Sequence, residues 1–195
     1  MNSSGEFFMR WRVRLGYPVA IVALWFARPE PRSILLGGVV GALGLCLRAY
    51  AAGYLHKQEV LTVTGPYAYT RNPLYLGSSI LTLGAAIAAR SWISALVLLS
   101  YFAVFYSIVM RREERELRLK HSAAFDQYAA AVPLFLPRLA PANFATSGES
   151  GSSDGKSSAG SFSLAQYMKN HEWQAAVGLL LLLAVLFVRW RIALH

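Results

Sequence analysis

Long apolar runs with few or no charges divide this chain, and they constrain its fold more than any other feature. A helix needs about 20 mostly apolar residues to cross a bilayer. Five segments approach or reach that length, and they cover residues 11–27, 33–54, 73–89, 92–110 and 175–188. We therefore predict an all-α integral membrane bundle of about five transmembrane helices with a cytoplasmic amphipathic helix.

The composition agrees with a membrane protein and argues against other classes. Hydrophobic residues make up 55% of the 195 residues and charged residues 15%, whereas a soluble domain carries roughly 25% charged residues. Such hydrophobicity excludes a disordered chain, and the single cysteine, Cys46, excludes a disulfide scaffold. We expect Cys46 to be a buried apolar filler. The net charge of +9 does not indicate nucleic-acid binding, because the apolar residues are clustered in long runs.

Composition also divides the chain into three parts. Residues 1–140 form the predicted membrane core, which ends in an amphipathic helix that begins after Met110 and stops near Pro133. Residues 141–163 are rich in Ser and Gly, so we predict a flexible linker. Residues 164–195 begin amphipathically and then become apolar. They predict a C-terminal helix whose amphipathic part either extends the same helix or lies partly among the headgroups.

The distribution of Lys and Arg predicts the orientation of the bundle. With the N-terminus in the cytoplasm, 14 of the 19 Lys and Arg residues fall on the cytoplasmic side, in agreement with the positive-inside rule. The polar segments 56–72 and 111–163 then lie on that side of a bacterial inner membrane or, in a eukaryote, of the endoplasmic reticulum. Arg48 lies within an apolar run, where it either faces a polar cavity or extends to the interface.

Two polar stretches remain as candidates for chemistry, because the common motifs are missing. The sequence contains no P-loop and no His-Glu-x-x-His, and its four histidines have no metal-ligand spacing. The first stretch, residues 64–77, offers a turn, the cation of Arg71, the amide of Asn72 beside a helix start, and several tyrosines. The second is the pair Glu113-Glu114, whose side chains point about 100° apart on a helix.

On residue chemistry alone, ordinary explanations for both stretches stay open. The two glutamates would be solvated partners of nearby arginines. The tyrosines would form an aromatic belt at the membrane interface. The choice between these explanations and a binding site depends on a resemblance that the two stretches carry together.

The two stretches resemble the signatures of the isoprenylcysteine carboxyl methyltransferase and phospholipid methyltransferase superfamily. The first signature is matched by Gly65-Pro66-Tyr67 followed by Arg71-Asn72-Pro73-Leu74-Tyr75-Leu76-Gly77, and the second by Glu113-Glu114-Arg115-Glu116-Leu117. An aromatic-rich segment that ends in Val132-Pro133 follows, as it often does in the family. The resemblance covers about residues 48–138, and one predicted helical hairpin separates the two signatures.

This resemblance implies an integral membrane enzyme that transfers a methyl group from S-adenosylmethionine to a lipophilic acceptor or membrane lipid at the cytosolic face. One of Glu113 or Glu114 would meet the ammonium group of the cofactor, and amide groups around Asn72 its carboxylate. Aromatic rings would meet the adenosyl part or the sulfonium, and a strand-like run over residues 61–65 would follow the nucleoside. The implied cofactor-binding residues are Leu61, Gly65, Tyr67, Asn72, Pro73, Tyr75, Glu113 and Glu114, and the candidate catalytic residues are Arg71 and Arg112.

Asn72 departs from the histidine that is common in the carboxyl methyltransferase branch, so it cannot hold a proton and the acceptor does not carry over. A carboxylate acceptor would be placed by Arg71 or Arg112, whereas an amine acceptor would need a base such as His56 or a glutamate. Two alternatives stay open, an NADPH-dependent membrane oxidoreductase resembling sterol reductases and a non-enzymatic membrane scaffold. We expect neither nucleic acid nor metal as a partner, and the sequence predicts no oligomeric state.

Overall fold

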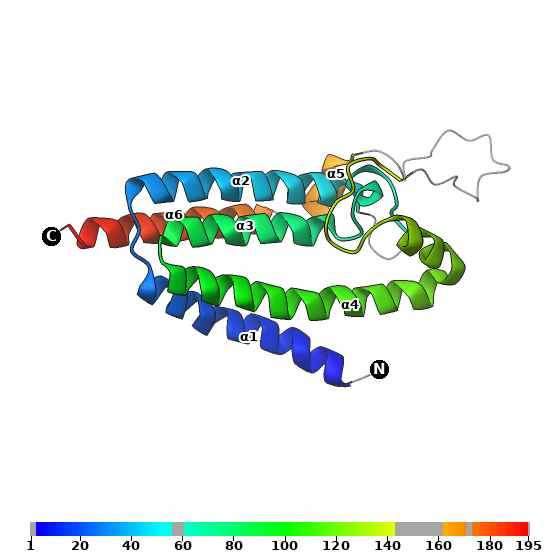
Figure 1. Cartoon of the computed structure of the whole chain (residues 1–195), viewed down its shortest axis with the longest axis horizontal. Helices are drawn as coiled ribbons and strands as arrows, with labels where there is room; N and C mark the ends of the chain where they lie inside the picture. The colour runs from blue at the N-terminus through cyan, green and yellow to red at the C-terminus, as the bar shows by residue number, and fades with distance from the viewer. Residues whose placement is uncertain (1–2, 56–60, 143–161, 171–172, 195) are drawn as a thin grey trace. The chain divides into compact units, whose positions relative to one another are not determined.

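The computed structural model describes residues 3–55, 61–142, 162–170 and 173–194 (Figure 1). These residues form helices and no β-strand, so the all-α prediction is confirmed. Most of the predicted linker and the candidate base His56 lie outside the described residues. The elements are α1 (Ser3–Phe26), α2 (Pro31–Tyr54), the 3-10 helix η1 (Gly65–Ala68), α3 (Pro73–Ala89), α4 (Trp92–Ala131), α5 (Leu164–Lys169) and α6 (Trp173–Ile192).

Within the described residues, α2, α4 and α6 are long and apolar enough to cross a membrane, judged by length and composition. Two shorter helical segments are also apolar, Arg14–Phe26 and Pro73–Ala89. The 17 residues of α3 correspond to about 25 Å of helix, slightly less than the hydrocarbon core of about 30 Å. The five apolar runs are thus all helical, and three of them lie in helices long enough to span.

The hairpin between α3 and α4 has the boundaries that the sequence predicts. Proline suits the first turn of a helix, because its missing N–H would have no helical partner there, and α3 begins at Pro73. Arg90 turns the chain with a φ of 48° before α4 begins at Trp92. The amphipathic segment predicted after Met110 continues the same helix as far as Ser122, where φ is 40° and ψ is −115°. The Arg, Glu, Leu and Lys residues of this segment all favour helix.

The described chain forms two compact units, each assembled from separate stretches of sequence. The first unit comprises Met1–Gly44, Ser79–Val109 and Ala175–His195, and the second comprises Leu45–Ser78 and Met110–Gln174. Every residue predicted for the cofactor or for catalysis belongs to the second unit. The candidate site is therefore built within one unit.

Close contact between α2 and α3 organises the first unit. A Cβ placed on Gly84 would lie 2.6 Å from the carbonyl oxygen of Gly37, which is too close for any larger residue without movement. Leu183 of α6 covers Gly38 of α2, and the three helices run side by side (Figure 1). Small residues permit such packing in membranes, where helices associate largely through van der Waals contact.

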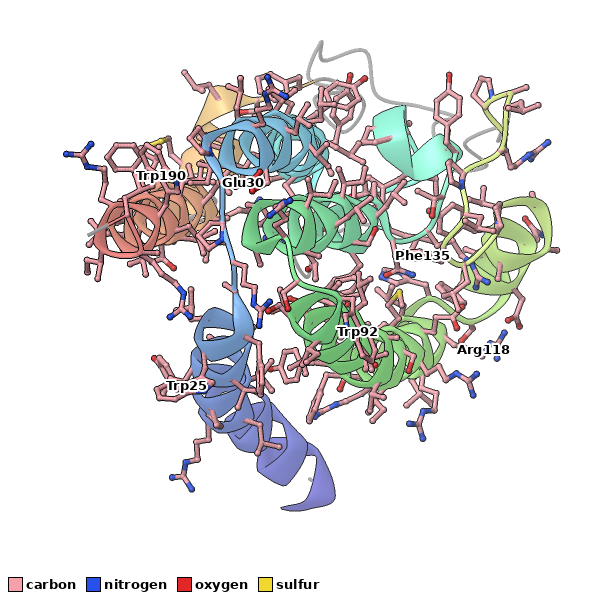
Figure 2. The ribbon with its side chains drawn as sticks, turned by 60° about the vertical axis from the view of Figure 1, so that its left-hand side comes forward. Trp25, Glu30, Trp92, Arg118, Phe135 and Trp190 are labelled. Atoms are coloured by element: carbon pink, nitrogen blue, oxygen red, sulfur yellow. The ribbon has the colours of Figure 1, made fainter. Side chains whose placement is uncertain are left out.

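Polar groups cap the helix ends at one side of the first unit. The N–H of Arg28 donates to the carbonyl of Ala89 at 2.8 Å, and the Nε of Arg189 donates to the carbonyl of Ala27 at 2.9 Å. These bonds satisfy carbonyl groups that helix ends leave without a helical partner. Trp25 lies in the last turn of α1 and Trp92 begins α4, and both are largely exposed (Figure 2). Tryptophan and arginine together are typical of a membrane interface.

In the second unit, Arg48 of α2 is bonded to α3. Its guanidinium donates to the hydroxyl of Ser78 and, at 3.4 Å, to the carbonyl of Leu74. Of the two alternatives for Arg48, the structure shows the one in which the charge meets polar groups inside the protein. The expectation of a buried Cys46 is wrong, because its side chain is exposed. The residues around Cys46 are apolar on every side of α2, so the sequence pattern does not predict which side of this helix is exposed.

The C-terminal part of the second unit packs on the end of α2. Asn170 donates from Nδ2 to the carbonyl of Ala52 at 2.8 Å, and the N–H of Ser163 donates to the carbonyl of Gly53 at 3.0 Å. A Cβ on Gly53 would overlap the ring of Phe162. The predicted C-terminal helix consists of two elements, since α5 ends at Lys169 and α6 begins at Trp173.

The contact between α2 and α3 predicts that Gly84→Val destabilises the protein by about 1–3 kcal/mol, the usual cost of overpacking. Gly178→Val is the matched control, because a Cβ at Gly178 of α6 would meet nothing within 4 Å. The free energy of unfolding in mixed micelles, followed by circular dichroism, compares the two variants. Equal stability of the two variants would contradict the proposed close contact.

Candidate cofactor site

The site begins with a turn that only glycine adopts easily. Gly65 has a φ of +59°, and a Cβ there would lie 2.6 Å from the ring of Tyr54. The left-handed region is costly for residues with a side chain. The ring of Pro66 then fixes its own φ at the start of η1, and Tyr67 is buried within η1. The first signature thus folds into a compact turn directly before α3.

A loop that follows α4 holds this turn in place, and we call residues 133–142 the 133–142 loop. Each of five hydrogen bonds between the turn and the loop uses a main-chain group of the loop. The donor–acceptor pairs are Arg71 N to Pro133 O at 3.0 Å, Asn72 Nδ2 to Leu134 O at 3.0 Å, Thr70 Oγ1 to Phe135 O at 2.9 Å, Arg138 N to Tyr69 O at 2.9 Å, and Ala142 N to Ala68 O at 3.0 Å. Because the bonds involve five consecutive residues of the turn, they fix its position relative to the loop.

The two signatures meet through two side-chain pairs. Arg71 forms an ion pair with Glu114, and the hydroxyl of Tyr75 donates to Glu113 Oε1 at 2.6 Å. The Arg71 and Glu114 side chains are only 14% and 25% exposed, so the pair is shielded from water. Adjacent carboxylates on a helix point in different directions, and here each carboxylate has its own partner from the start of α3. Glu114 is therefore paired with Arg71 of the other signature, whereas Glu113 is exposed and accepts from Tyr75.

Arg112 pairs with a third carboxylate of α4, that of Glu116. Its Nε donates to Glu116 Oε1 at 2.8 Å, one helical turn further along α4. Two guanidinium atoms, Arg71 Nε and Arg112 Nη1, are buried and have no hydrogen-bond partner among the described residues. A buried donor without a partner is costly. These two atoms are therefore candidates to bind an anionic group of a ligand.

An apolar cluster at the C-terminal end of α4 supports the turn. Its buried members are Phe125, Tyr128 and Val132, and Leu61 packs against them. The strand-like run expected over residues 61–65 is not found, since residues 61–63 have no regular secondary structure. Leu61 therefore contributes to the site through packing on the last part of α4.

Tyr128 connects this cluster to the turn, and it lies beyond the break at Ser122, outside the apolar part of α4. Its hydroxyl donates to the carbonyl of Tyr67 at 2.8 Å. Burial raises the pKa of the Tyr128 hydroxyl above its ordinary value, and the nearby charge of Arg71 opposes this only in part. The hydroxyl therefore stays protonated and remains a donor at all ordinary pH values.

The predicted site residues differ in how far they are exposed. Tyr67 and Pro73 are buried and shape the turn, whereas Arg71, Asn72, Tyr75, Arg112 and Glu114 are half-buried and Glu113 is exposed. The sequence did not point to Thr70 or to the carbonyl groups of residues 133–135, which hold the turn. A polar residue beside an Arg-Asn-Pro motif was the only signal for Thr70, and main-chain carbonyls leave no signal in a sequence.

The fold and the site define a class of protein, a helical membrane protein in which two polar signatures are joined at the start of a helical hairpin. Comparison with known families specifies this class further. Residues 33–122 match the family described as Phospholipid methyltransferase. The resemblance to the isoprenylcysteine carboxyl methyltransferase and phospholipid methyltransferase superfamily, which the two signatures carry, is therefore confirmed.

Three curated proteins are similar to parts of the chain. The nickel-cobalt-cadmium resistance protein NccN of Alcaligenes xylosoxydans xylosoxydans is 35% identical over 51% of this chain and 49% of its own length. The cobalt-zinc-cadmium resistance protein CzcN of Cupriavidus metallidurans is 31% identical over 66% of this chain and 62% of its own length. The protein-S-isoprenylcysteine O-methyltransferase of Schizosaccharomyces pombe is 30% identical over 42% of this chain and 35% of its own length. The chain thus spans between about a third and three fifths of these relatives, and no solved structure matches it significantly.

The bond between Tyr128 and Tyr67 predicts that Tyr128→Phe destabilises the protein by about 1–3 kcal/mol, because a buried carbonyl loses its donor. Since the pKa is raised in the folded state, the contribution of Tyr128 to stability is complete below pH about 10 and declines above it. The free energy of unfolding of the parent protein and of the Phe variant, measured from pH 7 to 11, tests this. The difference between the two should shrink at the alkaline end.

Tyr17→Phe is the matched control, because Tyr17 is 69% exposed and belongs to the first unit. Its stability should equal that of the parent protein. Equal losses in both variants, or a difference that does not change with pH, would contradict the role assigned to Tyr128.

Proposed function

We propose that this chain is an S-adenosylmethionine-dependent methyltransferase of the membrane that acts on a lipophilic acceptor at the cytosolic face. The observation that carries the proposal is the joining of the two signatures. Arg71, just before α3, contacts Glu114 on α4, and Tyr75, in the first turn of α3, contacts Glu113. All four residues lie within the segment that matches the phospholipid methyltransferase family, and one relative is named as a methyltransferase.

The groups present in the site fit the charged tail of S-adenosylmethionine. When bound, this cofactor supplies an electrophilic methyl group carried on a sulfonium. The carboxylates of Glu113 and Glu114 can accept from its ammonium group. The buried atom Arg71 Nε, which has no hydrogen-bond partner in the described part of the chain, can donate to its carboxylate. Tyr75 places an aromatic ring beside these groups, and such a ring attracts a cation.

Methyl transfer is an in-line displacement, so the protein contributes mainly by positioning its reactants. The turn before α3 is held by the 133–142 loop, which fixes the position of Arg71 before any ligand binds. Arg112 pairs with Glu116 through Nε, and its buried Nη1, which has no partner among the described residues, can donate to an acidic acceptor. Asn72 donates its side-chain amide to the carbonyl of Leu134 and takes no part in proton transfer.

Two of the relatives are named as metal resistance proteins. We make no proposal of metal handling from these names. In the parts of the chain that the structure describes, no group of three or more His, Cys, Asp or Glu side chains could hold a metal ion. The proposal rests on the joined signatures, on the family match and on the relative that is named as a methyltransferase.

The proposal predicts that Glu113→Gln and Glu114→Gln each weaken the binding of S-adenosylmethionine about tenfold or more, since a hydrogen bond to a charged group contributes about 1.5–3 kcal/mol. Titration calorimetry on the full chain in detergent micelles measures the affinity. Thermal unfolding of each variant checks that it remains folded.

Glu116→Gln is the matched control, because Glu116 lies on the same helix but pairs with Arg112 and is 55% exposed. Its affinity for the cofactor should not change. Unchanged affinity in both Glu113→Gln and Glu114→Gln would refute the assignment of the site. Binding of NADPH in place of S-adenosylmethionine would instead support the oxidoreductase alternative.

A further inference from the structure

The 133–142 loop exposes two large apolar side chains outside the apolar helices. Leu136 is 73% exposed and Leu139 is 104% exposed. All of residues 136–141 are exposed, and the only charge among them is Arg138. Single exposed leucines are common on proteins, but here the whole run Leu-Pro-Arg-Leu-Ala-Pro is exposed. Large apolar side chains exposed so close together in the sequence indicate a place of interaction.

The hydrogen bonds of the loop hold this surface in a defined position. They connect the loop to residues 68–72, and α3 begins at the next residue, Pro73. Arg138 adds a bond from Nη1 to the carbonyl of Ala131 at 2.6 Å, at the end of α4. The exposed leucines are thus carried by a fixed part of the second unit, which also contains Phe135 (Figure 2).

The length of α3 indicates the depth of that part in a bilayer. Its 17 residues cover about 25 Å, whereas the hydrocarbon core is about 30 Å thick. In a spanning position α3 falls about 5 Å short of the core, so the residues that flank it lie at or near the hydrocarbon boundary. Residues 68–72 flank α3 directly, and the 133–142 loop is bonded to them.

We propose that the 133–142 loop is an interfacial anchor, whose leucines insert into the bilayer at the boundary between acyl chains and headgroups. Leu136 and Leu139 supply the apolar surface, and Arg138 lies between them, where its cation meets lipid phosphate. The occupant of this surface is thus the lipid bilayer. The inference uses the depth of α3 and the exposure of the loop, so it stands whether or not the protein transfers methyl groups.

Fluorescence quenching tests this inference on the full chain in nanodiscs of phosphatidylcholine and phosphatidylglycerol. Cys46→Ala first removes the exposed native thiol. Leu139→Cys then carries an environment-sensitive fluorophore, and Gln127→Cys carries it in the control. Gln127 is also exposed and belongs to the same unit. The loop is held by main-chain groups, so the change at Leu139 leaves its hydrogen bonds intact.

We expect lipids with a nitroxide near the top of the acyl chain to quench the label at residue 139 several-fold more strongly than the label at residue 127. Aqueous iodide should give the opposite order. Equal quenching by iodide at both positions would show that the loop lies in water and overturn the proposal. A label at 139 that neither lipid nitroxide nor iodide quenches would show a protein occupant, either another segment of this chain or a second copy, and would overturn it as well.

Discussion

The ion pair between Arg71 and Glu114 is the interaction on which the second unit depends. It joins the turn before α3 to the polar part of α4, and both side chains are largely shielded from water. Removing one partner of a buried pair typically costs about 3–5 kcal/mol, and less where some exposure remains as here. The same contact brings the two family signatures together, although more than forty positions separate them in the chain. The ion pair that holds the turn against α4 therefore lies in the candidate cofactor site.

The hydrogen bonds between the turn and the 133–142 loop leave two guanidinium atoms available to bind a ligand. The 133–142 loop accepts or donates through its main chain and uses up the donors of Thr70, Asn72 and the Arg71 backbone. Arg71 Nε and Arg112 Nη1 remain buried without a partner among the described residues. Fully satisfied polar networks stabilise a fold, whereas the atoms they leave unpaired mark where a ligand can bind. The fixed turn and these two guanidinium atoms together support the proposed selectivity for a ligand with a charged tail.

Local features of the sequence predicted much of this structure. Pro73 and the Arg90-Ser91 break gave the bounds of α3 and the start of α4, because proline and turn residues act on their immediate neighbours. The pair Glu113-Glu114 and the Arg71-Asn72-Pro73 run identified the polar residues that the structure joins. Long-range features were not predictable in this way. The main-chain bonds to the 133–142 loop leave no pattern, the break at Ser122 has no glycine or proline to mark it, and a uniformly apolar α2 does not show that Cys46 is exposed.

Ultraviolet cross-linking of radiolabelled S-adenosylmethionine to the full chain, followed by peptide mapping, tests the central claim most directly. The claim is that the two signatures form one cofactor site within the second unit. The account predicts saturable labelling of the peptides that contain residues 61–75 and 112–117, and the label should be displaced by unlabelled cofactor. Labelling confined to peptides of the first unit, or labelling that excess cofactor does not displace, would contradict it.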